Sequence, residues 1–433
     1  MKVKKFSKKP EDFKNRSEAK PIICYPNDSL DDKNLDYTYD GYQLTIELPK
    51  EYKKGEHYTL YLKYIARPEK VKDKGSIAIT AAKGLYFINS TGSDPNKPTQ
   101  IWTQGETEAN SCWFPTIDSP NQKTTQEIYM TVPDKFLTLS NGILKSQTKN
   151  SDGTRTDYWK MDQKHAPYLV FMGVGEYSVV KDSWNNLEVN YYVEKEFESV
   201  ARDIFGNTPE MMTFFSNLTG IPYPWDKYSQ IVVRDYVSGA MENTTAVVHG
   251  EDAQQKRGQL IDKNEWEGTI AHELFHHWFG DLVTTESWAN LTVNESFATY
   301  SVYLWLQHKY GQDAADAPFV FLATGTGIAP FLSYIKTFET PPARCLYGVR
   351  READAIGYEE LRLHCPTHLA VSREPADGHH QGRITDLLDL LPLDSATHYY
   401  CCGLESMVND VSAWLQENGI GLSHIHREVF FHG

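Results

Sequence analysis

The sequence has no unbroken apolar run long enough to cross a bilayer as a helix. Its first twenty residues are basic but contain no apolar core, so they do not form a signal peptide. Acidic side chains outnumber basic ones by 58 to 43, and the formal net charge is −15. This excess argues against nucleic acid or an anionic membrane as a partner. The six cysteines follow no disulfide or zinc-binding spacing, so we expect free thiols.

Lysine almost disappears from the sequence after Lys309. Residues 310–433 contain one lysine, Lys336, but eight of the fifteen histidines and four of the six cysteines. A shift this abrupt indicates two coding origins, joined between about residues 310 and 318. With 433 residues, the chain is long enough for two or three domains, each with its own core.

The first part of the chain has the pattern of an all-β domain, which we place at residues 1–182. Apolar and polar side chains alternate at 42–48 and 57–64 with the period of two that half-buried strands show. Further strands are expected at 125–132, 136–140, 155–162 and 168–180. Together they predict a sandwich-like or saddle-shaped β domain.

The apolar period becomes that of helices from about residue 196. A helix is predicted over 196–218, with Gly220-Ile-Pro as its stop, and a short strand over 230–234. Two more helices are predicted over 265–279 and 297–310. This mixture predicts an α+β domain over residues 183–317.

The helix predicted over 265–279 carries the pattern His-Glu-x-x-His. His272 and His276 are four residues apart, so both imidazoles leave the same helix face. Two neutral imidazoles can hold one zinc ion, which then needs an oxygen ligand, and Glu295 is the candidate. Glu273 lies between the histidines and can act as general base towards a metal-activated water. The alternative is a buried helix whose histidines are satisfied by hydrogen bonds.

The stretch from His272 to Tyr300, with SGAMENTTAV at 238–247, resembles the M1 family of zinc aminopeptidases. The resemblance runs from about residue 35 to about residue 316. It implies one zinc ion per chain, a thermolysin-like zinc domain that is only partial here, and peptides with a free N-terminus as substrates. In this family Glu273 would be the catalytic base.

The same resemblance implies a set of substrate-binding residues: Glu106, Gly239, Ala240, Met241, Glu242 and Asn243. Glu242, with Glu106 beside it, would bind the positively charged amine of the substrate. The backbone of Gly239 and Ala240 would hydrogen-bond an extended peptide as an edge strand does. Taken alone, Glu106 is a solvated loop residue and 239–243 is a turn between strands.

Two parts of the M1 pattern are missing downstream. The family uses a tyrosine well beyond the third ligand to stabilise the oxyanion, and a helical C-terminal domain closes its substrate cavity. Tyr358 has a loosely plausible spacing, but its neighbours follow another pattern, so it is not assigned. We therefore expect impaired hydrolysis. The family is often exported and the resemblance starts inside its first domain, so the absent signal fits a truncated start; localisation and oligomeric state stay open.

The tail alternates short apolar strands with helices, which predicts a Rossmann-like α/β domain over 318–433 with helices on both faces of a parallel sheet. Strands are expected at 318–323, 344–349, 367–372, 397–402 and 424–431, and helices at 327–338, 357–363, 384–391 and 404–418. A glycine-rich turn after the first strand opens a helix, which is where a pyrophosphate binds backbone N–H groups.

The order of motifs in the tail resembles the NADP-binding half of ferredoxin/flavodoxin–NADP reductases. By this resemblance Thr324, Gly325, Thr326 and Gly327 would meet the pyrophosphate, Ser372, Arg373 and Arg383 a 2′-phosphate, and Cys402 and Gly403 the nicotinamide. The alternative for the arginines is solvated surface. No flavin-binding barrel precedes the tail, so we find no flavin site and no bound hydride acceptor.

Three hypotheses follow for this multidomain chain. The first is a zinc-dependent aminopeptidase that removes N-terminal residues from peptides and carries an incomplete catalytic domain. The second is an NADP(H)-binding oxidoreductase fragment. The third is a fusion product with neither activity.

Overall fold

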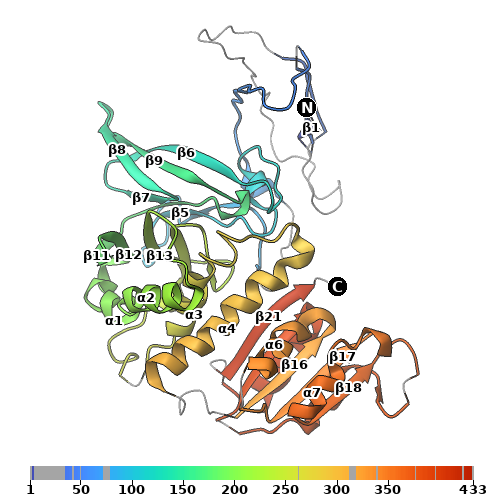
Figure 1. Ribbon diagram of the computed structural model, residues 1–433. Helices are drawn as coiled ribbons and strands as arrows, with labels where there is room; N and C mark the ends of the chain where they lie inside the picture. Colours follow the sequence, from blue (N-terminus) through green and yellow to red (C-terminus); the bar gives the residue numbers. More distant parts are fainter. Residues whose placement is uncertain are drawn as a thin grey trace. The chain divides into compact units, whose positions relative to one another are not determined.

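The computed structural model describes residues 2–3, 35–40, 43–48, 50–71, 79–261, 263–311, 318–337, 340–375, 377–394, 396–421 and 424–431. Cys24 and most of the basic N-terminal segment lie outside this range. The chain divides into two compact units that alternate along the sequence (Figure 1). Unit 1 comprises Met1–Arg202, Pro224–Lys256 and Glu286–Trp288, and unit 2 comprises Asp203–Tyr223, Arg257–Thr285 and Ala289–Gly433.

The described residues of unit 1 form four β-sheets. Three of them have the strand orders β1-β3-β2, β4-β5-β10-β7 and β6-β9-β8. Their strands are β1 (Lys2–Val3), β2 (Tyr37–Tyr39), β3 (Leu44–Ile46), β4 (Leu85–Ile88), β5 (Gln100–Thr103), β6 (Thr124–Pro133), β7 (Leu137–Ser140), β8 (Ile143–Lys149), β9 (Thr154–His165) and β10 (Met172–Gly175). The all-β character predicted for the N-terminal region is confirmed.

The fourth sheet of unit 1 has the order β11-β12-β13-β15-β14 and mixes parallel and antiparallel pairs. Its strands are β11 (Ser178–Trp184), β12 (Leu187–Val193), β13 (Lys227–Val233), β14 (Ala240–Met241) and β15 (Ala246–Gly250). Trp102, Trp159 and Ile231 come from three different sheets and share one buried apolar cluster. This cluster joins these three sheets into one body.

Two strand predictions in unit 1 were wrong in detail. Residues 57–64 form no strand, although their side chains still alternate largely between exposed and half-buried. The period of two therefore indicates an extended segment. Among the described residues, however, no strand pairs with it to form a sheet. The strand predicted over 168–180 is divided into the 3₁₀ turn η4 (Pro167–Leu169), β10 and β11, with Pro167 at the start of the turn.

The part of unit 2 that carries the predicted metal ligands consists of α2 (Thr208–Thr219), α3 (Glu267–Phe275) and α4 (Leu291–Tyr310). The single helix predicted over 196–218 is instead η5 (Lys195–Val200), α1 (Ala201–Phe205) and α2, which restarts with a proline in its first turn. Gly220 ends α2 in the left-handed conformation, as its predicted stop requires. The predicted helix over 265–279 is shorter, because His276 is already the C-cap of α3.

The tail forms a six-stranded, entirely parallel sheet in the order β19-β18-β17-β16-β20-β21 (Figure 1). Its strands are β16 (Phe319–Thr324), β17 (Arg344–Val349), β18 (Thr367–Val371), β19 (His380–Gln381), β20 (His398–Leu404) and β21 (Ile425–Phe431). Its helices are η8 (Gly325–Ile328), α6 (Ala329–Thr337), η9 (Glu352–Asp354), α7 (Tyr358–His364), η10 (Ile384–Leu390) and α8 (Glu405–Glu417). The predicted parallel sheet is confirmed, although 384–391 is a 3₁₀ rather than an α-helix.

Alternate strand residues divide the core of the tail into two apolar clusters. Phe321 and Tyr347 face the cluster that contains Phe331 of α6, and Leu322 and Leu346 face the cluster that contains Val411 of α8. Each face of the sheet is therefore covered, as buried parallel strands require.

Helix α4 also packs on the tail sheet, since Tyr300 and Tyr303 lie against the α6 cluster. The ring of Tyr303 is 5.6 Å from that of Tyr334. Among the described residues no helix is long and apolar enough to cross a membrane. Within the described range no disulfide involves the five cysteines Cys112, Cys345, Cys365, Cys401 and Cys402.

Candidate functional site

Helices α3 and α4 bring three potential metal ligands together in unit 2. Among the described residues His272, His276 and Glu295 form one group whose ligand atoms lie within 4.8 Å of one another. The two imidazole Nε2 atoms are 3.0 Å apart. The Glu295 carboxylate oxygen lies 3.4 Å from Nε2 of His272 and 3.5 Å from that of His276. One helical turn supplies both nitrogens and a second helix supplies the oxygen.

A hydrogen bond to the backbone fixes the orientation of the His276 ring. Its Nδ1 lies 3.0 Å from the backbone oxygen of Phe279. A carbonyl can only accept, so Nδ1 carries the proton and Nε2 presents a lone pair to the cluster. The turn that delivers this carbonyl contains Gly280 at φ +143°, where a Cβ atom would lie 3.1 Å from Nδ1 of His276. Sequence reasoning missed Gly280, whose only signal is its place after the motif.

The electrostatics of the cluster suit a cation. Burial alone would raise the pKa of Glu295, but His276 and His272 beside it hold that pKa below its usual range. Glu273, the candidate base, lies between the two histidines in α3 and is 6% exposed. His276 is fully buried, whereas the side chains of His272 and Glu295 keep 17% and 16% of their exposure. Solvent can therefore reach the cluster on the side of these two residues.

The predicted substrate-binding segment lies in unit 1. Ala240 and Met241 form β14, the edge strand of the five-stranded sheet, antiparallel to β15. Glu242 is 3% exposed, and its carboxylate accepts a hydrogen bond from the hydroxyl of Tyr168 at 3.3 Å. Asn243 is fully buried, and the Cβ position of Gly239 is open. The segment thus combines an edge strand with a buried carboxylate.

The loop that carries Glu106 meets this segment within unit 1. Nε2 of Gln104 lies 3.3 Å from the sulfur of Met241. Tyr236 donates to Oε1 of Gln104 at 2.7 Å. Glu106 itself is half-buried. The two segments picked out by sequence are therefore in contact through Gln104, to which sequence reasoning assigned no role of its own.

The nucleotide-binding candidates gather at the carboxyl edge of the tail sheet. The turn Gly325–Gly327 follows β16, and at Gly327 its close approach to β20 leaves no space for a side chain. A Cβ at Gly327 would lie 2.3 Å from the backbone oxygen of Cys402, and a Cβ at Gly403 would lie 2.2 Å from Oγ1 of Thr324. The backbone N–H of Leu404 donates to that same Thr324 hydroxyl at 2.7 Å. The structure thus joins Thr324–Gly327 to Cys402-Gly403.

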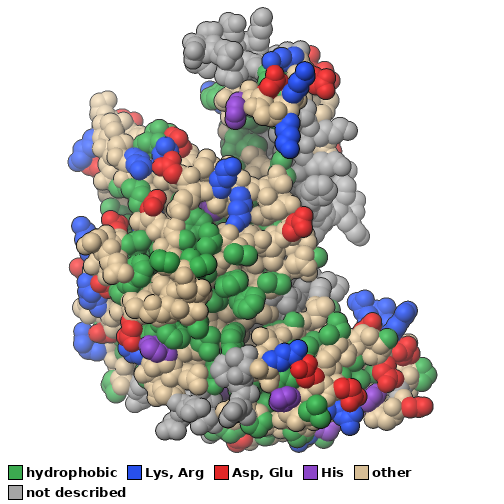
Figure 2. All heavy atoms as spheres, viewed as in Figure 1, with side chains coloured by type: hydrophobic (Ala, Val, Ile, Leu, Met, Phe, Trp, Pro, Cys, Tyr) green, Lys and Arg blue, Asp and Glu red, His purple; other side chains and the backbone are tan. Residues whose placement is uncertain are grey.

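The three candidate phosphate ligands follow neighbouring strands of the same sheet. Ser372 and Arg373 come directly after β18, Arg383 comes shortly after β19, and these strands pair in parallel. All three side chains are exposed. Over the tail, on the face shown in Figure 2, acidic and basic side chains are interspersed. The arginines are thus accessible, as either a phosphate site or a solvated surface requires.

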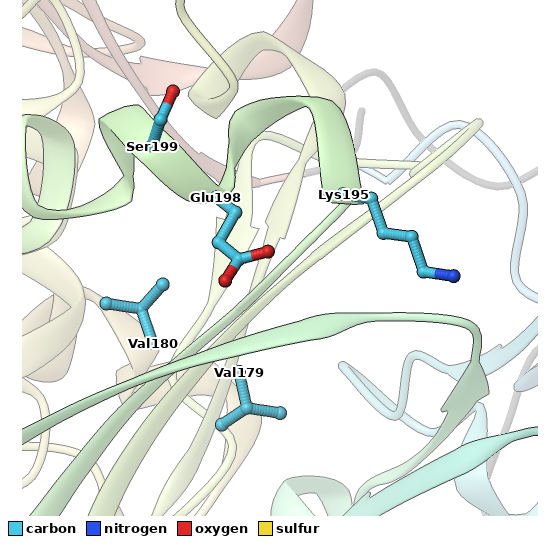
Figure 3. Close-up of a pocket in the computed structure, with 5 residues that line it drawn as sticks. All are labelled: Val179, Val180, Lys195, Glu198 and Ser199. Carbon is cyan, nitrogen blue, oxygen red and sulfur yellow. The ribbon is translucent and has the colours of Figure 1, made fainter.

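A shallow hollow of about 540 Å³ on unit 1 involves none of the predicted residues. It is lined by Val179, Val180, Lys195, Glu198 and Ser199, from β11 and η5 (Figure 3). The Glu198 carboxylate accepts a hydrogen bond from Ser178 at 2.7 Å. This hollow brings no catalytic group together.

Comparison with known proteins places these features in families. Residues 25–169 match the Peptidase M1 N-terminal domain, and residues 204–326 match the Peptidase family M1 domain. Residues 321–413 match the Oxidoreductase NAD-binding domain. The last two matches meet at residues 321–326, shortly after the composition of the sequence changes at about residues 310–318.

Curated relatives agree with the first two matches. The chain is 33% identical over 224 residues to Tricorn protease-interacting factor F2 of Thermoplasma volcanium, covering 51% of this chain and 27% of that protein. It is 27% identical over 299 residues to Probable aminopeptidase 1 of Saccharolobus solfataricus, covering 67% and 36%. It is 30% identical over 230 residues to human Glutamyl aminopeptidase, covering 52% and 24%.

The chain therefore spans only about a quarter to a third of the length of these relatives. The oxidoreductase match covers a different segment from the two peptidase matches and overlaps them at residues 321–326 alone. Residues 25–169 and 204–326 thus match two domains of peptidase family M1, and a match to an oxidoreductase NAD-binding domain follows at 321–413.

Proposed function

We propose that this chain is a zinc-dependent aminopeptidase of the M1 type, built on a partial thermolysin-like domain. One observation carries the proposal: His272, His276 and Glu295 converge from α3 and α4, with Glu273 between the histidines. Aminopeptidase names among the relatives support the same reaction.

The spacing of the three ligand atoms fits zinc. Zinc–nitrogen bonds of about 2.0–2.1 Å in a tetrahedral site place neighbouring ligand atoms about 3.3 Å apart. The separations here are 3.0, 3.4 and 3.5 Å. Two neutral imidazoles and one carboxylate, with a further position open to solvent, are the ligand set of a catalytic rather than a structural zinc site.

The residues of the chain divide the chemistry between them. A bound zinc ion would supply Lewis acidity towards water and the peptide carbonyl. Glu273 would accept a proton from the attacking water and pass it to the leaving amine. Glu242, with Glu106, would bind the positively charged α-amine, while β14 would pair with the peptide backbone. No tyrosine is assigned to the oxyanion, so we expect slow turnover.

Metal content and peptide hydrolysis test this proposal together. The purified chain should contain about one zinc per molecule, and His272→Ala should lose it. Glu273→Gln should keep the zinc and abolish release of the N-terminal residue from an aminoacyl-anilide. A folded protein that binds no zinc would overturn the proposal. Hydrolysis that persists in Glu273→Gln would instead show that Glu273 is not the catalytic base.

The tail supports a second candidate function, an NADP(H)-binding oxidoreductase fragment with a Rossmann-like fold. The observation in its favour is the glycine turn Gly325–Gly327 at the carboxyl edge of a parallel sheet. Titration of the Arg373→Ala and Arg383→Ala variants with NADPH and with NADH tests it. Loss of the arginines should weaken the binding of NADPH more than the binding of NADH. Equal effects on the affinities for the two nucleotides would indicate that the arginines are solvated surface residues.

A further inference from the structure

Glu267 is a buried carboxylate that the proposed reaction does not use. It is the first residue of α3 and is 5% exposed. Three side chains donate to it: Asn207 Nδ2 at 2.9 Å and Trp305 Nε1 at 2.8 Å reach Oε1, and the Tyr310 hydroxyl reaches Oε2 at 2.6 Å. Asn207 is the N-cap of α2, and Trp305 and Tyr310 belong to α4. One carboxylate therefore ties together three helices.

The position of this contact matters for the metal cluster. His272 follows Glu267 by five residues in α3, and Trp305 follows Glu295 by ten residues in α4. The two histidines and Glu295 sit on different helices, so their separation depends on how α3 lies against α4. Next to Glu267 the two helices approach closely, since a Cβ at Gly268 would lie 3.2 Å from Cγ1 of Val302. A contact that fixes how α3 packs against α4 therefore also fixes the distances between Glu295 and the two histidines.

Two further features show that the contact is strong and specific. Trp305 is fully buried, so its indole N–H has to be satisfied inside the protein. Tyr310 is 53% exposed, but partial burial raises its pKa, and its hydrogen bond to Glu267 raises that pKa further, as expected for a phenol that donates to a carboxylate. Hydrogen bonds with a charged acceptor are about twice as strong as neutral ones.

We propose that Glu267 is a positioning residue for the metal centre, holding α4 against α3 so that Glu295 stays beside His272 and His276. This inference rests on the proposed metal site. Tyr310 is the last residue of α4 and lies where the composition of the sequence begins to change. Its hydrogen bond to Glu267 therefore fixes the end of α4 to the start of α3 shortly before the tail.

The test compares Glu267→Gln with Glu210→Gln. Glu210 also binds α4, through Lys309, but its side chain is 47% exposed. In Glu267→Gln the amide NH₂ replaces one carboxylate oxygen, and it cannot accept a hydrogen bond from the donors of Asn207, Trp305 or Tyr310. We expect the zinc dissociation constant, measured by chelator competition, to rise about 10- to 100-fold. The visible absorption bands of the Co²⁺-loaded protein should change as well, because they report ligand geometry. Glu210→Gln should match the wild type in both.

Tyr310→Phe provides a second variant that removes one hydroxyl and keeps the packing. It should show a smaller rise of the zinc dissociation constant and a shift of the Co²⁺ bands in the same direction. Wild-type zinc affinity and Co²⁺ spectra in both Glu267→Gln and Tyr310→Phe would overturn the positioning role. A wild-type chain that binds no zinc would instead overturn the proposed function, and this inference with it.

Discussion

The ammonium group of Lys227 lies 2.8 Å from the backbone oxygen of Thr245 and 2.9 Å from that of Ser140. Lys227 is 2% exposed, and its ammonium also lies 3.1 Å from the Thr245 hydroxyl. It thereby connects β7, β13 and the turn that follows Glu242 and Asn243. Burial lowers the pKa of Lys227 to about 7.

This pKa predicts a stability that rises with pH. An unfolded lysine has a pKa of about 10.4, so between pH 7 and about 10 the unfolded chain binds more protons than the folded chain. Stability then increases with pH through that window. Urea unfolding at pH 7.5 and pH 9.5 measures the increase. The unfolding midpoint of the wild type should move to higher urea concentration at the higher pH.

Lys227→Met provides the control for this pH dependence. Its carbonyl partners lose a donor, and a buried polar group without a partner costs about 1–3 kcal/mol, so the variant should be less stable at pH 7.5. Its stability should change less with pH than that of the wild type. Parallel pH dependences in the two proteins would show that Lys227 does not titrate in this range.

A pair of histidines in the tail predicts the same trend, a stability that rises with pH, in the acid range. Nδ1 of His398 lies 2.9 Å from Nε2 of His426. Burial, with His424 and Lys263 nearby, lowers the pKa of His398 to about 4. Burial, with the same two residues and His398 nearby, lowers that of His426 to about 3. The Tyr400 ring stacks on His426. Both imidazoles are therefore neutral when folded, and stability should fall as the pH drops from 6.5 towards 4.

Thermal unfolding from pH 7 to pH 4.5 checks this loss. The double variant His398→Gln, His426→Gln should lose less stability over that interval than the wild type. His364 is exposed, so His364→Gln should follow the wild type. If the double variant and the wild type lose stability equally, carboxylates elsewhere explain the acid sensitivity.

Gly327 gives a prediction for the fold of the tail. A Cβ at this position would lie 2.3 Å from a backbone oxygen of β20, so Gly327→Ala has to move η8 away from the sheet. We expect a loss of about 1–3 kcal/mol, measured by urea unfolding, together with weaker NADPH binding. The Cβ position of Gly258 is open, so Gly258→Ala should change stability by less than about 0.5 kcal/mol. A stable Gly327→Ala would contradict this packing.

The sequence was most informative where a pattern depends on neighbours along the chain. The tail elements were predicted almost completely, because buried parallel strands are short apolar runs and the helices between them differ in period. The spacing of His272 and His276 also predicted their shared helix face. These features need no knowledge of the tertiary structure.

The sequence was least informative where a contact depends on distant segments. Residues 57–64 have the correct alternation for a strand, but pairing depends on a partner that the pattern does not contain. Glu267 is, in sequence, one more acidic residue at a helix start, and its role becomes visible only when Asn207, Trp305 and Tyr310 surround it. The exposure of Arg373 and Arg383 likewise could not be predicted from their order along the chain.

Gly280 carries the last prediction, on the metal centre. Its positive φ strains any other residue, and a Cβ there would press on both Nδ1 and the backbone oxygen of His276. Gly280→Ala should therefore disturb the hydrogen bond from His276 to Phe279 and raise the zinc dissociation constant about tenfold. Thr299→Val should have a smaller effect, because that hydroxyl is 3.5 Å from Nδ1 of His272, at the limit of a hydrogen bond. Chelator competition on both variants, with unfolding of the metal-free proteins alongside, separates affinity from stability. Equal zinc affinities in Gly280→Ala and the wild type would mean that the orientation of His276 does not depend on this turn.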